Sequence, residues 1–68
     1  MKSGWFVRKI FLGSGAAYEV YRLTNAQAPD EQYNREIHGT YSTHEDAITA
    51  SKMLNAEAAA RFWKGGSE

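Results

Sequence analysis

The chain contains no cysteine and only one proline among its 68 residues. Without cysteine, neither a disulfide nor a zinc–thiolate cluster can stabilise the fold. A chain of this length is close to the lower size limit for independent folding, and such domains usually gain stability from a disulfide, a metal or an oligomeric partner. The lack of cysteine therefore leaves an efficient core or a partner, and it fits a reducing compartment.

Long hydrophobic runs are also missing. The longest apolar stretches span a few residues, such as Trp5–Val7, whereas about 20 are needed to cross a bilayer. Lys2 gives a positive start, but no apolar stretch follows it, because Arg8 and Lys9 interrupt the sequence, so we predict no secretory signal. We therefore expect a cytoplasmic protein without a membrane partner.

The chain has no net charge, since eight basic residues balance eight acidic ones. A neutral protein lacks the overall field that draws binders to nucleic acid. The charges are unevenly distributed along the chain. Residues 1–28 hold four basic residues and one acidic residue, whereas residues 29–46 hold five acidic residues and one basic residue. We interpret this division as a solvated surface.

Aromatic and β-branched residues predict strands at 5–12, 17–24 and 35–42. Gly13–Gly15 is a short connector suited to positive φ and to a hairpin. Residues 25–34 form a polar loop that contains the single proline. The sequence therefore predicts three consecutive antiparallel strands.

An alanine-rich segment without proline follows, and it predicts a helix from residue 44 to about 64. Thr43 precedes it, and Asp46 three residues later resembles the acid of a capping box. Gly65–Gly66 supplies the stop signal. Asn55 is the one position where we expect a break or bend.

The predicted fold class is therefore α+β, with a three-stranded antiparallel sheet followed by a C-terminal helix. We expect a single domain at residues 1–64 and a flexible tail at residues 65–68.

Side-chain periodicity predicts which faces meet. On the helix, the sheet-facing residues are expected to be Ala47, Ile48, Ser51, Leu54, Ala58 and Phe62. On the sheet, the core face is expected to carry Trp5, Val7, Lys9, Phe11, Glu19, Tyr21, Leu23, Arg35, Ile37 and Tyr41. The opposite face is expected to carry Phe6, Arg8, Ile10, Leu12, Tyr18, Val20, Arg22, Glu36, His38 and Thr40. A one-residue bulge would exchange these faces.

No catalytic constellation stands out, because none of the serines has an oriented base or a recognisable context. His38 and His44, with Glu36 or Asp46, fit no zinc-ligand spacing. The glycines of Gly13–Gly15 lack the third glycine of a phosphate-binding loop. We therefore expect no enzyme activity, no metal, no cofactor and no small-molecule substrate.

Binding is predicted instead for the outer face of the sheet and for the helix side opposite the core. Arginine beside large apolar residues is typical of interfaces. Met53 and Trp63 lie with alanines on the far side of the helix, where large apolar residues indicate contact with a partner. The residues predicted to bind are Phe6, Arg8, Ile10, Tyr18, Arg22, His38, Met53 and Trp63.

The run GTYSTHEDAITASKMLN, which begins at Gly39, resembles the end of the third strand and the start of the helix in AP2-type DNA-binding domains. Arm-binding domains of phage integrases have a similar layout. The similarity in residues covers mainly 39–50. It implies that the sheet docks in the DNA major groove with the helix behind it, and that Arg8, Arg22 and His38 face the DNA.

Three functions remain open. We favour a non-enzymatic protein-interaction module of the size of regulators or inhibitors encoded by phages and mobile elements. The alternative is a DNA-binding domain that reads the major groove with its sheet, although Glu36 lies among the basic residues of that face. The third is a homodimer that buries its outer sheet face.

Overall fold

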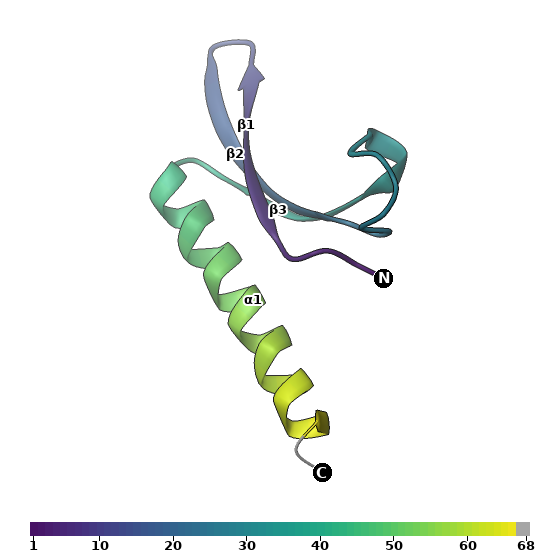
Figure 1. The fold of residues 1–68 in the computed structure, drawn as a ribbon. Coiled ribbons are helices and arrows are strands. Elements are labelled where there is room, and N and C mark those ends of the chain that lie inside the picture. Colours follow the sequence, from purple (N-terminus) through teal and green to yellow (C-terminus); the bar gives the residue numbers. More distant parts are fainter. Residues whose placement is uncertain (67–68) are drawn as a thin grey trace.

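The computed structural model describes the backbone of residues 1–66 and the side chains of residues 1–60. It shows an α+β domain in which three antiparallel strands are followed by a C-terminal helix, as predicted (Figure 1). The strands lie in the order β1-β2-β3. The elements are β1 Phe6–Leu12, β2 Gly15–Leu23, the short 3-10 helix η1 Gln32–Asn34, β3 Arg35–Tyr41 and α1 His44–Gly66.

Helix α1 begins at the predicted position. The Thr43 Oγ1 atom accepts a hydrogen bond from the backbone N–H of Asp46 at 3.2 Å, which confirms Thr43 as the N-cap. The helix does not break at Asn55, and it extends two residues past its expected end, to Gly66. The first half of the predicted tail is therefore helical, and residues 67–68 lie outside the described part of the chain.

The β1–β2 connection is shorter than predicted, and this difference reassigns the faces of β2. Only Gly13 and Ser14 form the turn, and Leu12 pairs with Gly15. No glycine in the described part of the chain has positive φ, so the expected left-handed turn is wrong. A three-residue connector would have paired Leu12 with Ala16. Because side chains alternate along a strand, losing one connector residue moves every β2 side chain to the other face.

As a result, the even-numbered residues of β2 meet the helix. Val20 is completely buried, as is Ala47 of α1. The Tyr18 ring packs edge-on against His44 at 5.3 Å between centroids. The Arg22 guanidinium lies over the Trp5 ring, 4.4 Å from its centroid. The placement of Tyr18, Val20 and Arg22 on the outer face was therefore wrong.

A bulge in β3 shifts the third strand as well. Val20 pairs with Gly39 and Tyr21 with Ile37, so His38 is the extra residue. Before the bulge, Glu36 pairs with Arg22 on the helix side, contrary to the prediction. His38 also lies on the helix side, because its ring contacts Trp5 at 5.8 Å and Tyr41 at 6.4 Å. Five residues assigned to the core lie instead on the outer face or its edge, namely Glu19, Tyr21, Leu23, Arg35 and Ile37.

The buried core is small. Its hydrophobic members are Ala17, Val20, Tyr21 and Ala47, and Val20 is the largest fully buried side chain in the described part of the chain. On α1, Ser51 is buried and Leu54 is half-buried, as expected for the sheet-facing side. Ala58, however, is exposed, because α1 extends past the sheet (Figure 1). The side chain of Phe62 lies outside the described part of the chain.

Asn55 fastens the helix to the start of the sheet. Its Oδ1 atom accepts a hydrogen bond from the Trp5 N–H at 2.8 Å, and its Nδ2 atom donates one to the Trp5 carbonyl at 3.3 Å. A Cβ at Gly4 would lie 3.3 Å from Asn55 Oδ1, so the lack of a side chain at Gly4 leaves space for the Asn55 amide beside the backbone. Asn55, the position where the sequence predicted a break in the helix, is therefore the residue that attaches the helix to the sheet.

Replacing Asn55 should loosen the helix from the sheet. We expect Asn55→Ala to lower the free energy of unfolding by about 1–3 kcal/mol, since it removes two hydrogen bonds of about 0.5–1.5 kcal/mol each. Chemical denaturation monitored by circular dichroism measures the change. Asn55→Asp keeps the acceptor and should lose less than Asn55→Ala. Equal stability of Asn55→Ala and wild type would contradict this docking role.

Candidate partner-binding face of the sheet

The sheet has one face without a helix. In the paired register, Arg8 lies opposite Glu19, Phe6 opposite Tyr21, and Tyr21 opposite Ile37. We call this surface the outer face. Its members by register and alternation are Phe6, Arg8, Ile10, Leu12, Ala17, Glu19, Tyr21, Leu23, Arg35, Ile37 and Thr40.

Tyr21 is the centre of the outer face. It is buried, and the guanidinium groups of Arg8 and Arg35 lie 5.9 Å and 5.5 Å from its ring centroid. The Phe6 ring is 5.9 Å away. The Tyr21 hydroxyl donates a hydrogen bond to Asp30 Oδ2 at 3.0 Å. Burial raises the pKa of Tyr21, and the hydrogen bond to the Asp30 carboxylate adds to this effect.

Two ion pairs fix the arginines. Arg8 Nε donates to Glu19 Oε1 at 2.8 Å, and Arg35 Nε donates to Asp30 Oδ1 at 2.7 Å. The hydrogen bond from Arg35 is the largest influence that lowers the pKa of Asp30. Because each guanidinium is bonded through Nε, its planar fork is held in one orientation. The remaining N–H groups of Arg8 make no hydrogen bond and remain available to a ligand.

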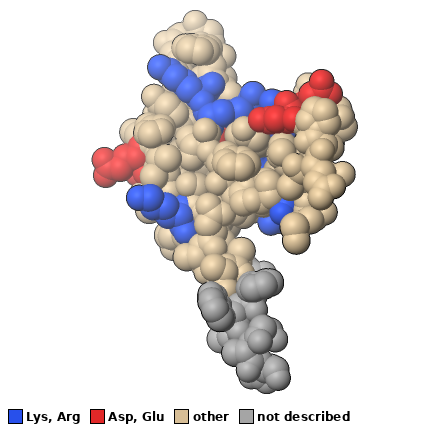
Figure 2. All heavy atoms as spheres, viewed as in Figure 1, with Lys and Arg blue, Asp and Glu red and all other residues tan. Residues whose placement is uncertain are grey.

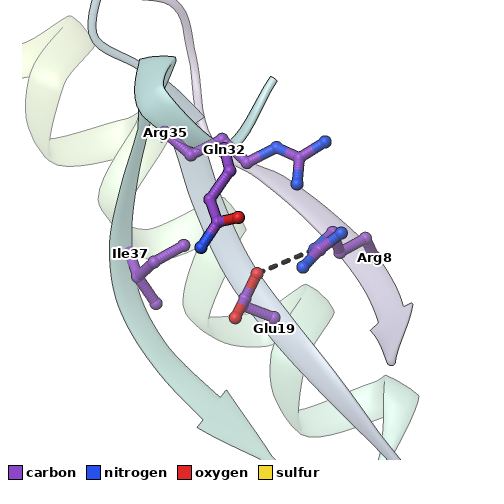
Figure 3. Close-up of a pocket in the computed structure, with 5 residues that line it drawn as sticks. All are labelled: Arg8, Glu19, Gln32, Arg35 and Ile37. Carbon is purple, nitrogen blue, oxygen red and sulfur yellow. Dashed lines mark hydrogen bonds and ion pairs between the residues drawn. The ribbon is translucent and has the colours of Figure 1, made fainter. Parts of the chain in front are cut away.

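A cavity of about 560 Å³ opens between these side chains. It is lined by Arg8, Glu19, Gln32, Arg35 and Ile37 (Figure 3). In Figure 3 the Gln32 amide extends between Ile37 and Glu19, and it makes no hydrogen bond. The cavity therefore offers unpaired donors and acceptors beside an aliphatic wall, which suits polar groups that pack against an apolar side chain.

Asn34 holds in place the 24–34 loop, which carries Asp30 and Gln32. This buried side chain accepts hydrogen bonds from Thr24 Oγ1 at 2.7 Å and from the Asn25 N–H at 2.9 Å. Its Nδ2 group donates to the carbonyls of Asn25, Ala28 and Pro29 at 2.9, 3.4 and 3.0 Å. One amide thus organises the whole 24–34 loop against the sheet.

Charges of both signs intermingle on the surface. Figure 2 shows a row of basic side chains across the upper part of that view, and acidic side chains lie at its end. On the helix side, Arg22 donates two hydrogen bonds to Glu36, at 3.2 and 3.0 Å. These bonds, and then one from Lys2, lower the pKa of Glu36. The arginines of the sheet are therefore already neutralised by carboxylates.

The predicted binding residues divide between different surfaces. Phe6, Arg8 and Ile10 do lie together on the outer face. The predicted companions Tyr18, Arg22 and His38 lie on the helix side and cannot contact the same partner surface. Met53 is 61% exposed on α1. The side chain of Trp63 lies outside the described part of the chain.

Sequence reasoning missed the residues that complete the outer face. These are Glu19, Tyr21, Asp30, Gln32, Asn34, Arg35 and Ile37. The signal that would have found the strand residues among them is the length of the Gly13–Ser14 turn, because that length pairs Arg8 with Glu19. Asp30 and Asn34 gave no signal, because nothing in the sequence shows how the 24–34 loop folds back.

No group of three His, Asp or Glu side chains gathers in residues 1–60 as metal ligands. Within the described residues, α1 is not apolar enough to pass through a bilayer.

Asn34 should be indispensable for the loop wall. We expect Asn34→Asp to lower the free energy of unfolding by about 1–3 kcal/mol. In the variant a carboxylate oxygen, which cannot donate, faces the carbonyls that receive hydrogen bonds from Asn34 Nδ2 in the wild type. Denaturant titration measures the loss. Asn25→Asp is a milder control, since the Asn25 side chain only accepts a hydrogen bond, from the Gln27 N–H. Asn34→Asp with wild-type stability would refute the bonding pattern.

Acid should weaken the domain through Asp30 and Glu36. Both pKa values are lowered in the folded state, so the stabilisation is complete above the unfolded pKa of about 4 and is lost as pH falls through the folded values. We expect the free energy of unfolding to be level above about pH 5 and to decrease below about pH 4. Asp30→Asn should flatten this decrease. Glu31→Gln, at a side chain without a hydrogen bond, should not flatten it.

The comparisons with known proteins supply no relative for this chain. No family model, no curated protein and no solved structure matches it. The similarity to AP2-type and integrase arm-type domains therefore stays a prediction from sequence, and the outer face has to be interpreted from its own chemistry.

Proposed function

We propose that this chain is a non-enzymatic protein-interaction module that binds a partner protein with the outer face of its sheet. The observation that carries the proposal is the arrangement around Tyr21. Two arginines are held against a buried tyrosine, and large apolar side chains surround them. Tyrosine and arginine are enriched among the residues that dominate binding energy at protein interfaces.

The apolar rim supports the same conclusion. Phe6, Leu12 and Ile37 are each about half exposed on a face that no helix covers. A domain with so small a core gains stability by burying such side chains in a complex. The ion pairs of Arg8 and Arg35 also fix their side chains before binding, which lowers the entropy lost on association.

DNA binding receives less support from this geometry. Arg8 and Arg22 were the residues expected to contact DNA together, yet they lie on opposite sides of the sheet. Both are paired with carboxylates, and Arg35 is paired as well. A phosphate would have to compete with Glu19 and Asp30, which are fixed beside the arginines. A protein partner can instead accept hydrogen bonds from the free N–H groups and leave the ion pairs intact.

In this role the domain carries out no reaction and acts only by covering a surface of its partner. A domain that acts by covering a partner's surface is suited to be a regulator or an inhibitor. This role agrees with the mixture of exposed apolar and paired charged groups on the outer face.

The test is affinity capture from the native host, with the bound proteins identified by mass spectrometry. Wild type should retain a specific partner that Ile37→Asp loses, since a carboxylate in the rim would be desolvated on binding. Ser42→Asp, at an exposed loop residue away from the outer face, should retain it. Circular dichroism checks that both variants are folded.

Salt separates the two kinds of partner. Capture of the protein should change little between low and physiological salt. Tight retention on double-stranded DNA that falls steeply with salt, and is lost in Arg8→Ala, would overturn the proposal in favour of DNA.

A further inference from the structure

β1 forms an open and regular edge of the sheet (Figure 1). The strands lie in the order β1-β2-β3, so within residues 1–66 both β1 and β3 have a neighbouring strand on one side only. β3 is interrupted by the bulge at His38, and a bulge disrupts pairing with a further strand. β1 pairs with β2 over its whole length without a bulge, and it contains no proline. β1 is therefore the edge that is suited to accept another strand.

Hydrogen bonds at the far end of β2 show which backbone groups line this edge. The Leu23 N–H donates to Ser3 Oγ at 2.8 Å, and the Leu23 carbonyl accepts from the Ser3 N–H at 3.0 Å. The odd-numbered residues of β2 therefore direct their backbone groups toward β1. Because Tyr21 pairs with Phe6, the even-numbered residues of β1 face β2. The odd-numbered residues of β1 direct their N–H and C=O groups outward, and these are Val7, Lys9 and Phe11.

The side chain of Asn55 already occupies the first outward position. It accepts a hydrogen bond from the Trp5 N–H and donates one to the Trp5 carbonyl, as a neighbouring strand would. Trp5 is two residues before Val7, so its backbone groups point to the same side. No loop or side chain of residues 1–60 forms such bonds with Val7, Lys9 or Phe11. These three residues therefore offer unpaired donors and acceptors.

Helix α1 leaves the sheet at this same edge. His44, at its start, contacts Tyr18 of the middle strand β2. Asn55, three turns later, bonds to Trp5 just before β1. Residues 56–60 follow this contact and are exposed. The part of α1 that extends past the sheet therefore lies on the side where a fourth strand would be added, about 4.8 Å beyond β1.

β1 exposes large apolar side chains on both faces of the sheet. Phe6 and Leu12 lie on the outer face and are 47% and 57% exposed, and Phe11 on the helix side is 81% exposed. A partner that docks flat on the outer face would cover only the first two. The side chains of an added strand alternate between the two faces, so it would cover all three.

Lys9 determines which occupant fits the edge. The arginines of the three strands are each paired with a carboxylate. Lys9 is the remaining cation of the sheet, and it makes no ion pair within residues 1–60, where its ammonium lies 5.4 Å from the Phe11 ring centroid. Two copies of β1 paired antiparallel along their whole length would place Lys9 opposite Lys9, and like charges directly opposite one another destabilise a sheet. An acidic residue of a different protein would instead form a pair of opposite charge.

We propose that the partner protein adds an extended, acidic segment to β1 as a fourth strand of the sheet. The inference rests on the proposed function, because this segment belongs to the partner that covers the outer face. Backbone hydrogen bonds to Val7, Lys9 and Phe11 hold the segment, and a carboxylate opposite Lys9 gives selectivity. On the outer face, its side chains continue the contact that begins at Phe6 and Arg8.

Amide hydrogen exchange of the full chain, measured by NMR with and without a peptide, tests the proposal. The probe is the end-blocked heptapeptide Thr-Val-Thr-Glu-Thr-Val-Thr, which favours an extended conformation and carries one acid. In the free chain, the N–H groups of Lys9 and Phe11 should exchange faster than those of Arg8 and Ile10, which face β2. At millimolar peptide, the Lys9 and Phe11 N–H groups should become protected. The peptide with lysine in place of glutamate should bind about fivefold more weakly.

Proline at position 9 should block the edge without breaking the hairpin. Lys9→Pro removes an N–H that faces away from β2, where proline is tolerated in edge strands, and it should abolish peptide binding. Lys9→Thr keeps the N–H and removes the charge, so it should weaken binding only about fivefold. Circular dichroism checks that both variants are folded. A synthetic chain with a methyl group on the Lys9 backbone nitrogen keeps the side chain, blocks the same donor and should also lose binding.

Affinity capture from the native host separates this inference from the proposed function. A partner that wild type retains should be lost by Lys9→Pro as well as by Ile37→Asp. A partner lost by Ile37→Asp but retained by Lys9→Pro would leave the proposed function intact and exclude the added strand. Capture of no partner, together with protection of the Lys9 N–H by the peptide, would count against the proposed function and support the open edge.

Three results of the peptide experiments would overturn the proposal. Exchange at Lys9 and Phe11 that millimolar peptide leaves unchanged would show that β1 accepts no strand. Protection of both N–H groups in the free chain, with a sedimentation mass of two chains, would show that β1 pairs with a second copy. Undiminished peptide binding by the chain methylated at the Lys9 nitrogen would place the peptide elsewhere.

Discussion

The two-residue turn at Gly13–Ser14 is the constraint on which the rest of the structure depends. By pairing Leu12 with Gly15, it fixes the register of β1 against β2, and the register decides which β2 side chains meet α1. Val20 is buried under the helix as a result, while Tyr21 faces the opposite side between Arg8 and Arg35. A turn of one more residue would bury Tyr21 under the helix and leave Val20 in solvent.

The small core explains why so much of the molecule faces outward. Small side chains such as Ala47 and Ser51 bring α1 close to the sheet, but they bury little apolar area. Polar contacts also hold the fold together, since hydrogen bonds of Asn55 attach the helix to the sheet and hydrogen bonds of Asn34 hold the 24–34 loop. The large apolar residues are distributed on the surface instead, among them Phe11 at the hairpin tip, which is 81% exposed. A domain whose large apolar residues lie on its surface is suited to bury them against a partner.

The sequence was sufficient for the elements but not for their faces. Residue propensities and the Thr43 cap predicted three strands and a helix within two residues of their observed bounds, because these signals are local. The core and outer faces were partly exchanged, because they depend on one turn residue in the first hairpin and on the bulge at His38. Of the predicted binding residues on the sheet, Phe6, Arg8 and Ile10 lie together and Tyr18, Arg22 and His38 do not. The ion pair of Arg35 with Asp30 was beyond prediction, because it depends on how the loop returns to the sheet.

The register of β1 against β2 requires that Val20, and not Tyr21, lies beneath the helix. Proton–proton distances from nuclear Overhauser spectroscopy on the full chain address it directly. The structure predicts contacts from the Val20 methyl groups to α1 near Ala47, and from the Tyr21 ring to the side chains of Arg8 and Arg35. Contacts between the Tyr21 ring and Ala47, with Val20 free of the helix, would contradict the register and with it the outer face.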